Sequence, residues 1–149
     1  MLDAPEGAEV GAGFADAVSM RQLRDWVDAE DADALLASLQ RKAVAPGDAM
    51  LVPAGLPHSV PAGVFVLELQ EPTDLSILLE WREFAVDGRR DGHLDLGFEV
   101  VLEAVDRSAV SAADLDALTL TREQIDAAGL QRALPARADA YFRIHRVDA

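Results

Sequence analysis

The side chains of this sequence that could do chemistry lie close to its middle. His58 stands directly after a turn that contains Pro53, Gly55 and Pro57. Two prolines and a glycine restrict the backbone of such a turn, so that the side chain after it is held in a defined direction. That arrangement is useful if an imidazole must meet a metal ion or a substrate. It is also typical of an ordinary tight turn, in which the histidine ring bonds to the backbone.

A short run after this turn adds a carboxylate and an amide. Residues 64–70 alternate as a predicted strand, which places Glu68 and Gln70 on one face beside two valines. Imidazole, carboxylate and amide oxygen together suit zinc or a similar divalent ion. A structural zinc site takes about four ligands, and no second histidine stands at His-x-His or His-x-x-x-His spacing from His58. The metal-ligand interpretation of His58 and the turn-histidine interpretation therefore both stay open.

Glu68 also has two interpretations. An acidic residue in an otherwise apolar strand is unusual unless it is paired or faces water. Its functional interpretation is a general base among apolar neighbours, and its structural one is an exposed rim position or a salt bridge.

Asp74 is, from local sequence, a turn aspartate, and Arg89 and Arg90 could hold a phosphate or form a solvated hairpin tip. Structural roles are predicted for His93, His145, Trp26 and Trp81.

Composition narrows the class of protein. The chain has 149 residues, half of them hydrophobic, which is enough for one domain with a core. Its net charge of −14 argues against nucleic acid and anionic membranes as partners. The absence of cysteine excludes disulfides, thiolate metal sites and a cysteine nucleophile. No apolar run is long enough to span a membrane and the N-terminus has no basic region followed by an apolar segment, so a cytoplasmic protein is expected. No phosphate-binding or hydrolase motif occurs, which argues against nucleotide-dependent and hydrolase functions.

Periodicity predicts helices towards both ends of the chain and strands between them. Ser19 to Gln22 has the pattern of a capping box and is followed by apolar residues at helical spacing. Arg41 and Lys42 follow the second predicted helix as cations that match its dipole. The predicted helices cover residues 20–29, 32–40 and 97–105 and start again at 111–115 and at 121, the last one ending at 129; the predicted strands cover 49–52, 58–60, 64–70, 76–84 and 141–147.

Four short patterns in residues 46–74 carry a resemblance to a known family. The stretch PGDAMLVPAGLPHSVPAGVFVLELQEPTD contains Pro-Gly-Asp, Pro-x-Gly-x-x-His, a strand with Glu-x-Gln, and Thr-Asp, in that order. It resembles the second half of the catalytic cupin of class I mannose-6-phosphate isomerases. VGAGFADAVSMRQLRDWVD is similar to the strand exit and helical insert before it, GHLDLGFEVVLEAVD to the segment after the sheet, and YFRIHRVDA to the first strand of a second cupin.

The resemblance implies an α+β fold built on part of a jelly roll. We expect a partial cupin of antiparallel strands with a helical insert and a C-terminal helical linker. The expected parts are a strand exit and helical insert at 1–45, the second half of the catalytic barrel at 46–96, a helical linker at 97–140, and the start of a second cupin strand at 141–149.

The same resemblance implies an activity, a cofactor and a site. The family exchanges mannose 6-phosphate and fructose 6-phosphate with one zinc ion, so the expected partner is a sugar phosphate. His58 corresponds to a zinc ligand of the family, and Glu68 and Asp74 to residues that line the sugar site, with Glu68 the candidate acid/base. Such an exchange moves a proton between C1 and C2 through an enediol, which needs a base and a group that stabilises the enediolate oxygen.

Two departures from the family pattern modify this expectation. Nothing here matches the family's other zinc ligands, a Gln-x-His pair and a later Glu, so we expect an incomplete part of the enzyme, inactive alone and able to dimerise through open sheet edges. Leu78 stands where the family has an arginine, and Arg82 is a possible substitute. The alternatives are a non-catalytic sugar-binding or regulatory cupin and a structural module in which Glu68 faces solvent.

Overall fold

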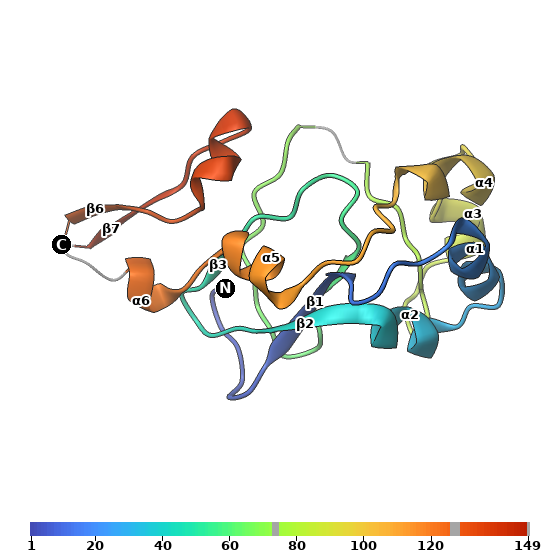
Figure 1. Cartoon of the computed structure of the whole chain (residues 1–149), viewed down its shortest axis with the longest axis horizontal. Coiled ribbons are helices and arrows are strands. Elements are labelled where there is room, and N and C mark those ends of the chain that lie inside the picture. The colour runs from blue at the N-terminus through green and yellow to red at the C-terminus, as the bar shows by residue number, and fades with distance from the viewer. Residues whose placement is uncertain (73–74, 126–128, 149) are drawn as a thin grey trace.

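A three-stranded antiparallel sheet lies at the centre of the structure (Figure 1). The computed structural model describes residues 1–72, 75–125 and 129–148. Strand β1 (Glu9–Phe14) is the middle strand, with β2 (Leu39–Ala43) on one side and β4 (His58–Ser59) on the other. A Cβ on Gly11 of β1 would lie 2.8 Å from both Leu39 Cδ1 and Ser59 Oγ. Glycine therefore allows the flanking strands to pack closely against β1.

Two helices between β1 and β2 agree with the sequence pattern. Helix α1 (Met20–Asp28) begins where the Ser19 hydroxyl accepts a hydrogen bond from the Gln22 N–H at 3.2 Å. Helix α2 (Ala32–Ser38) is two residues shorter than predicted, because the chain joins β2 at Leu39. Pairing with β1 overrides helical propensity there. Arg41 donates to the Leu36 carbonyl at 2.9 Å, as expected of a cation at the end of α2, whereas Lys42 pairs with Asp116 instead.

The remaining elements form two small sheets and several short helices. Strand β3 (Ala49–Met50) pairs with β5 (Thr119–Leu120), and β6 (Gly129–Arg132) pairs with β7 (His145–Asp148). Strands β5 and β6 lie in the part expected to be a helical linker, which is therefore only partly helical. The short helices are α3 (Gly88–Asp91), α4 (Phe98–Val101) continuing as η1 (Leu102–Ala104), α5 (Ala112–Ala117), α6 (Arg122–Ile125) and η2 (Ala136–Ala140).

Helices α1 to α4 gather at one end of the molecule and the β6–β7 hairpin lies at the other, with the central sheet between them (Figure 1). Two apolar clusters stabilise this arrangement. The first joins β1 to α1, α2 and η1, and the second lies under β3, α5 and η2. Their most deeply buried large side chains are Phe14, Leu23, Val27 and Leu102 in the first cluster and Leu115 in the second.

The predicted strand at 64–70 is not formed. Phe65 makes an isolated bridge with Asp3, and no strand continues from it. Exposure alternates only over residues 64–67, and residues 67–70 are all exposed; Phe65, Leu67 and Leu69 are 63%, 77% and 50% exposed. The pattern suits a strand, but a strand needs a neighbour to exchange backbone hydrogen bonds with, and among the described residues only Leu2 and Asp3 bond to it in this way, both at Phe65.

The predicted strand at 76–84 is also absent, and residues 75–86 contain only turns, bends and irregular backbone. The fold is thus mixed α+β with antiparallel sheets, and the described residues form no closed barrel. No helix in the described ranges combines the length and apolar character needed to cross a membrane.

Candidate functional site

The turn before His58 is anchored from two sides. The Leu56 N–H donates to the Pro53 carbonyl at 3.1 Å, and the Gly55 carbonyl accepts from the Asp106 N–H at 2.8 Å. Gly55 has a φ of +82°, and a Cβ there would lie 2.6 Å from the Ala104 carbonyl oxygen. Only glycine fits both the backbone angle and this close approach. The turn is therefore fixed against the segment that follows η1.

His58 continues from this turn into the central sheet. It stands opposite Ala12 of β1, and the preceding Pro57 carbonyl accepts from the Gly13 N–H at 2.7 Å. The His58 Nδ1 lies 3.1 Å from the Leu56 carbonyl oxygen. Because a carbonyl can only accept, Nδ1 carries the hydrogen, and Nε2 keeps its lone pair on an exposed ring. The hydrogen bond to the backbone that a turn histidine is expected to make is therefore present. It also stabilises the tautomer found in many metal-bound histidines.

Of the two carboxylates predicted for the site, only Glu68 lies within the described residues. Glu68 is exposed and makes no hydrogen bond or ion pair with any described residue. Gln70 is exposed as well. Asp74 lies outside the described residues. Within the described ranges no three side chains of histidine, aspartate or glutamate gather as a metal-binding group. These residues thus offer zinc one oriented donor, His58, which falls short of the about four ligands of a zinc site.

The arginines that could meet an anionic substrate are held by carboxylates. Arg82 lies 2.6 Å from Asp33 of α2, and this hydrogen-bonded contact lowers the pKa of the Asp33 carboxyl. Arg89 contacts Glu30 at 2.5 Å, and Arg90 contacts the adjacent Asp91 at 2.7 and 2.8 Å. Arg89 and Arg90 belong to α3 rather than to a hairpin tip.

Leu78, at the position where the resembling family has arginine, donates its N–H to the Gly92 carbonyl at 3.0 Å. Its side chain is 37% exposed. No guanidinium takes its place from Arg82, because Arg82 is paired with Asp33.

His93 and Trp81 have the packing roles expected of them. The His93 Nδ1 accepts from the Gly97 N–H at 3.2 Å, and its ring meets Phe98 edge-on with centroids 5.3 Å apart. Trp81 stacks on the same Phe98 at 5.9 Å. These contacts attach the segments on both sides of α3 to α4 and the residue before it.

A buried carboxylate, which the sequence analysis named only as part of the Pro-Gly-Asp pattern, joins two distant segments. Asp48 is 7% exposed and accepts from the Ala45 N–H at 2.9 Å and from the Arg122 N–H at 2.7 Å. Its position after Pro46-Gly47 was the available signal, since aspartates of turns often bond to the backbone.

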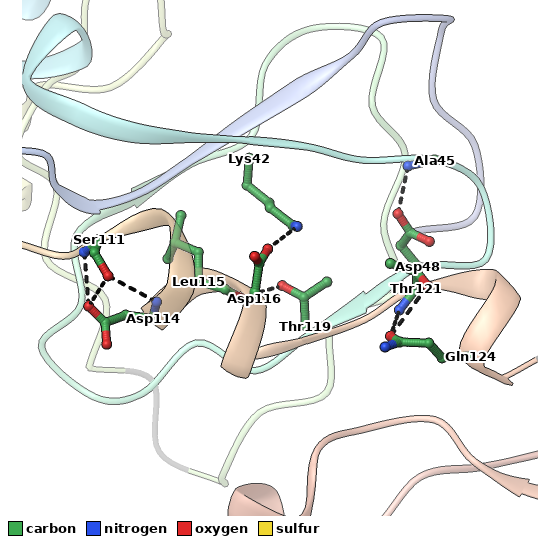
Figure 2. Close-up of polar contacts among 10 residues, drawn as sticks. All are labelled: Lys42, Ala45, Asp48, Ser111, Asp114, Leu115, Asp116, Thr119, Thr121 and Gln124. Atoms are coloured by element: carbon green, nitrogen blue, oxygen red, sulfur yellow. Dashed lines mark hydrogen bonds and ion pairs between the residues drawn. The ribbon is translucent and has the colours of Figure 1, made fainter.

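Figure 2 shows this carboxylate together with polar contacts of α5 and α6, of which the Lys42–Asp116 ion pair joins α5 to β2 and the others lie within residues 111–124. The contacts are Lys42–Asp116 at 2.6 Å, the Thr119 hydroxyl to the Leu115 carbonyl at 2.8 Å, the reciprocal Ser111–Asp114 cap of α5, and the Thr121 N–H to Gln124 at 2.8 Å.

Comparison with known proteins gives one partial similarity. The mannose-6-phosphate isomerase of Streptococcus mutans serotype c is 38% identical over 74 residues. These residues are 50% of this chain and 22% of the relative, so the chain matches less than a quarter of that enzyme's length. No protein-family model matches the chain, and no solved structure matches it.

Proposed function

We propose that this chain is part of a zinc-dependent aldose–ketose isomerase that interconverts mannose 6-phosphate and fructose 6-phosphate. The partial identity to a mannose-6-phosphate isomerase is the observation that carries the proposal. The tautomer of His58 supports it, because its Nε2 lone pair is free to bind a metal ion. The other ligands would have to come from outside the described residues.

Proton transfer is the part of the reaction that we assign to this chain's own side chains. Isomerisation removes a proton from one of C1 and C2 and returns it to the other, and a carboxylate is a suitable base. We assign this role to Glu68, whose carboxylate is exposed and engaged by no described residue. Asp74 is proposed to line the sugar site beside it. We further propose that residues 1–149 alone are inactive.

Metal content is the first test. Zinc is measured by mass spectrometry in the native gene product that carries this sequence, in its His58→Ala variant and in a matched His145→Ala variant. All are purified without chelators or affinity histidines. The proposal expects zinc near one per chain that disappears only in His58→Ala. Equal zinc in all three proteins would exclude His58 as a ligand.

Activity is the second test. The same proteins and a Glu68→Gln variant are assayed for conversion of mannose 6-phosphate. Loss of one general acid/base lowers kcat by about 10²- to 10⁴-fold, and we expect this of Glu68→Gln while KM changes little. Turnover by residues 1–149 alone would contradict the proposal that the chain is inactive by itself.

Leu78 favours a second candidate, a non-catalytic cupin that binds a sugar or regulates carbohydrate metabolism. The family's arginine is missing at this position, and Arg82 is engaged by Asp33. A guanidinium stabilises anionic groups through paired hydrogen bonds that leucine cannot make. Sugar binding without any isomerisation by the native gene product would select this candidate over the first.

A further inference from the structure

A small polar pocket is lined by none of the residues of the turn that carries His58. It has a volume of about 200 Å³ and lies where the end of β1 meets α1 and the end of α2. Asp16 follows β1, Gln22 and Trp26 stand on α1, and Ser38 ends α2; the rest of the wall is made of small apolar side chains. Gln22 and Trp26 are four positions apart on one helix, so they share a face.

The walls of this pocket are held in place by hydrogen bonds and by the core. The Ala15 N–H donates to the Ser38 carbonyl at 2.8 Å, which joins the chain after β1 to the end of α2. The Val18 N–H donates to the Arg107 carbonyl at 2.9 Å. Behind the pocket, Leu23 of α1 is fully buried. The pocket is therefore formed before any ligand arrives, which lowers the entropy lost on binding.

Several polar groups in the pocket have no partner within the described part of the chain. The exposed Asp16 carboxylate and Gln22 side-chain amide and the half-buried Trp26 indole N–H make no hydrogen bond there, so all three are open to a ligand from solvent. Gln22 is informative, because the capping-box pattern predicts that its amide bonds back to Ser19, and only the reverse bond from its N–H is formed. The Ser38 hydroxyl donates to the Leu35 carbonyl at 2.6 Å, so its oxygen can still accept.

We propose that this pocket binds a neutral polyhydroxylated ring, of the size of one monosaccharide or cyclic polyol. Hydroxyl groups both donate and accept, and the pocket offers acceptors on Asp16 and Ser38, a donor on Trp26 and both kinds on Gln22. Trp26 lines the pocket and is half-buried, so the part of its indole that is not packed on the core offers apolar surface to the C–H face of such a ring. The volume lies below the roughly 300 Å³ at which pockets for drug-sized ligands begin, which limits the ligand to about one ring.

The charge of the pocket favours a neutral ring over a sugar phosphate. The pocket is lined by one carboxylate and by no lysine or arginine, and the whole chain carries −14. Both features repel a phosphate group. The pocket shares no residue with the proposed isomerase site, and neither proposal depends on the other.

Nuclear magnetic resonance of residues 1–149 tests the proposal. D-Glucose, D-mannose and myo-inositol are titrated separately while the Trp26 indole and the amides of residues 15–18 and 22 are observed. We expect a saturable shift with at least one probe, confined to these signals. Asp16→Ala and Gln22→Ala should each weaken binding about tenfold or more, because a charged or bidentate hydrogen-bonding group is lost. Asp25→Ala, which removes an exposed carboxylate of α1 outside the pocket, should leave binding unchanged.

Three results would overturn the proposal. They are the absence of a saturable shift with all three probes, equal binding by the Asp16→Ala and Gln22→Ala variants, and tighter binding of tetramethylammonium or glucose 6-phosphate than of the neutral probes. The signals of residues outside the pocket show in each variant whether the fold is intact. His58→Ala should bind the probes normally, so the outcome is read separately from any metal or isomerase result.

Discussion

The carboxylate of Asp48 and the backbone N–H of Arg122 lie 2.7 Å apart, although many residues separate them in the sequence. Asp48 is almost fully buried and also accepts from Ala45. One side chain thus joins the turn before β3 to the start of α6. It keeps β3 in position to pair with β5.

Replacing Asp48 with alanine should destabilise the protein by about 2–4 kcal/mol. Two backbone N–H groups would lose a charged acceptor, and a buried donor without a partner is costly. Urea unfolding followed by circular dichroism measures the change. Asp116→Ala is the matched control, because its carboxylate is exposed and an exposed ion pair contributes only about 0–1 kcal/mol. Equal losses in the two variants would contradict this account of Asp48.

Gly55→Ala should be more damaging than Gly7→Ala. Both glycines have a positive φ, +82° and +74°, so both substitutions add backbone strain. Only at Gly55 would the new Cβ also approach the Ala104 carbonyl oxygen, at 2.6 Å, whereas nothing lies within 4 Å of Gly7. We expect about 1 kcal/mol for Gly7→Ala and at least twice that for Gly55→Ala, measured by thermal unfolding. A smaller effect at Gly55 would mean that the turn is not packed against the segment after η1.

The neutral ring of His58 should carry its hydrogen on Nδ1. The Leu56 carbonyl 3.1 Å away can only accept and so stabilises that tautomer. Long-range ¹H–¹⁵N spectra at alkaline pH distinguish the two nitrogens. The ring of His145 provides a comparison within the same spectrum. A hydrogen on Nε2 of His58 would leave no lone pair directed outward for a metal ion and would remove a support of the proposed function.

Acid should weaken the cap of α5 through Asp114. Hydrogen bonds from the Ser111 hydroxyl and N–H hold the pKa of the Asp114 carboxyl below its ordinary value of 3.8. Because the folded pKa is lower than the unfolded one, the stabilisation is fully present above about pH 4 and is lost as the pH falls through the folded value. A ¹³C titration of the Asp114 carboxyl measures this.

Ser111→Ala is the variant that tests this cause. It removes the hydroxyl donor, so the pKa of Asp114 should rise towards its ordinary value. Ser108→Ala is the control, since Ser108 bonds to Asp106 and not to Asp114. A Ser111→Ala variant whose Asp114 titrates as before would show that the hydroxyl bond is not the main cause.

The apolar row at Phe65, Leu67 and Leu69 should promote self-association of residues 1–149. An extended segment with exposed apolar side chains and few backbone partners is a site for pairing with another strand. Sedimentation equilibrium should show a dimer that Leu67→Lys weakens by about tenfold or more. Leu96→Lys, which changes another exposed leucine, should not weaken it. Identical behaviour of both variants would place the contact elsewhere.

The helices and strands that were predicted correctly are those whose start and end signals lie within a few residues of each other in the sequence. Helix α1 follows from Ser19 and from apolar side chains at helical spacing, and the short strand at His58 from its bounding prolines. Strands β2 and β6 were missed, because each is formed only by pairing with a strand elsewhere in the chain. The strand predicted at 64–70 is absent for the opposite reason: its sequence alternates strongly, but no partner strand lies beside it in the described structure.

The candidate site was likewise predictable only where its signal is local in the sequence. The rigid turn before His58 could be predicted from Pro53, Gly55 and Pro57, and the structure has it. The Leu56 carbonyl that selects the histidine tautomer could not, because periodicity says nothing of ring orientation. Trp26 was expected to pack, and it does contact the core, but the pocket beside it depends on how β1, α1 and α2 meet.

The pairing of β3 with β5 has a consequence for the order of folding. It brings Met50 beside Thr119, so a long loop must close before either two-residue strand gains its hydrogen bonds. Closing that loop costs chain entropy, and the few hydrogen bonds between the two short strands offset it only after the loop has closed. The β1–β2 pair and α1 involve much shorter loops and larger buried surfaces, and should form first. The β3–β5 pair and the Asp48 contact would then close the structure last, and in native-state hydrogen exchange they would open before the central sheet does.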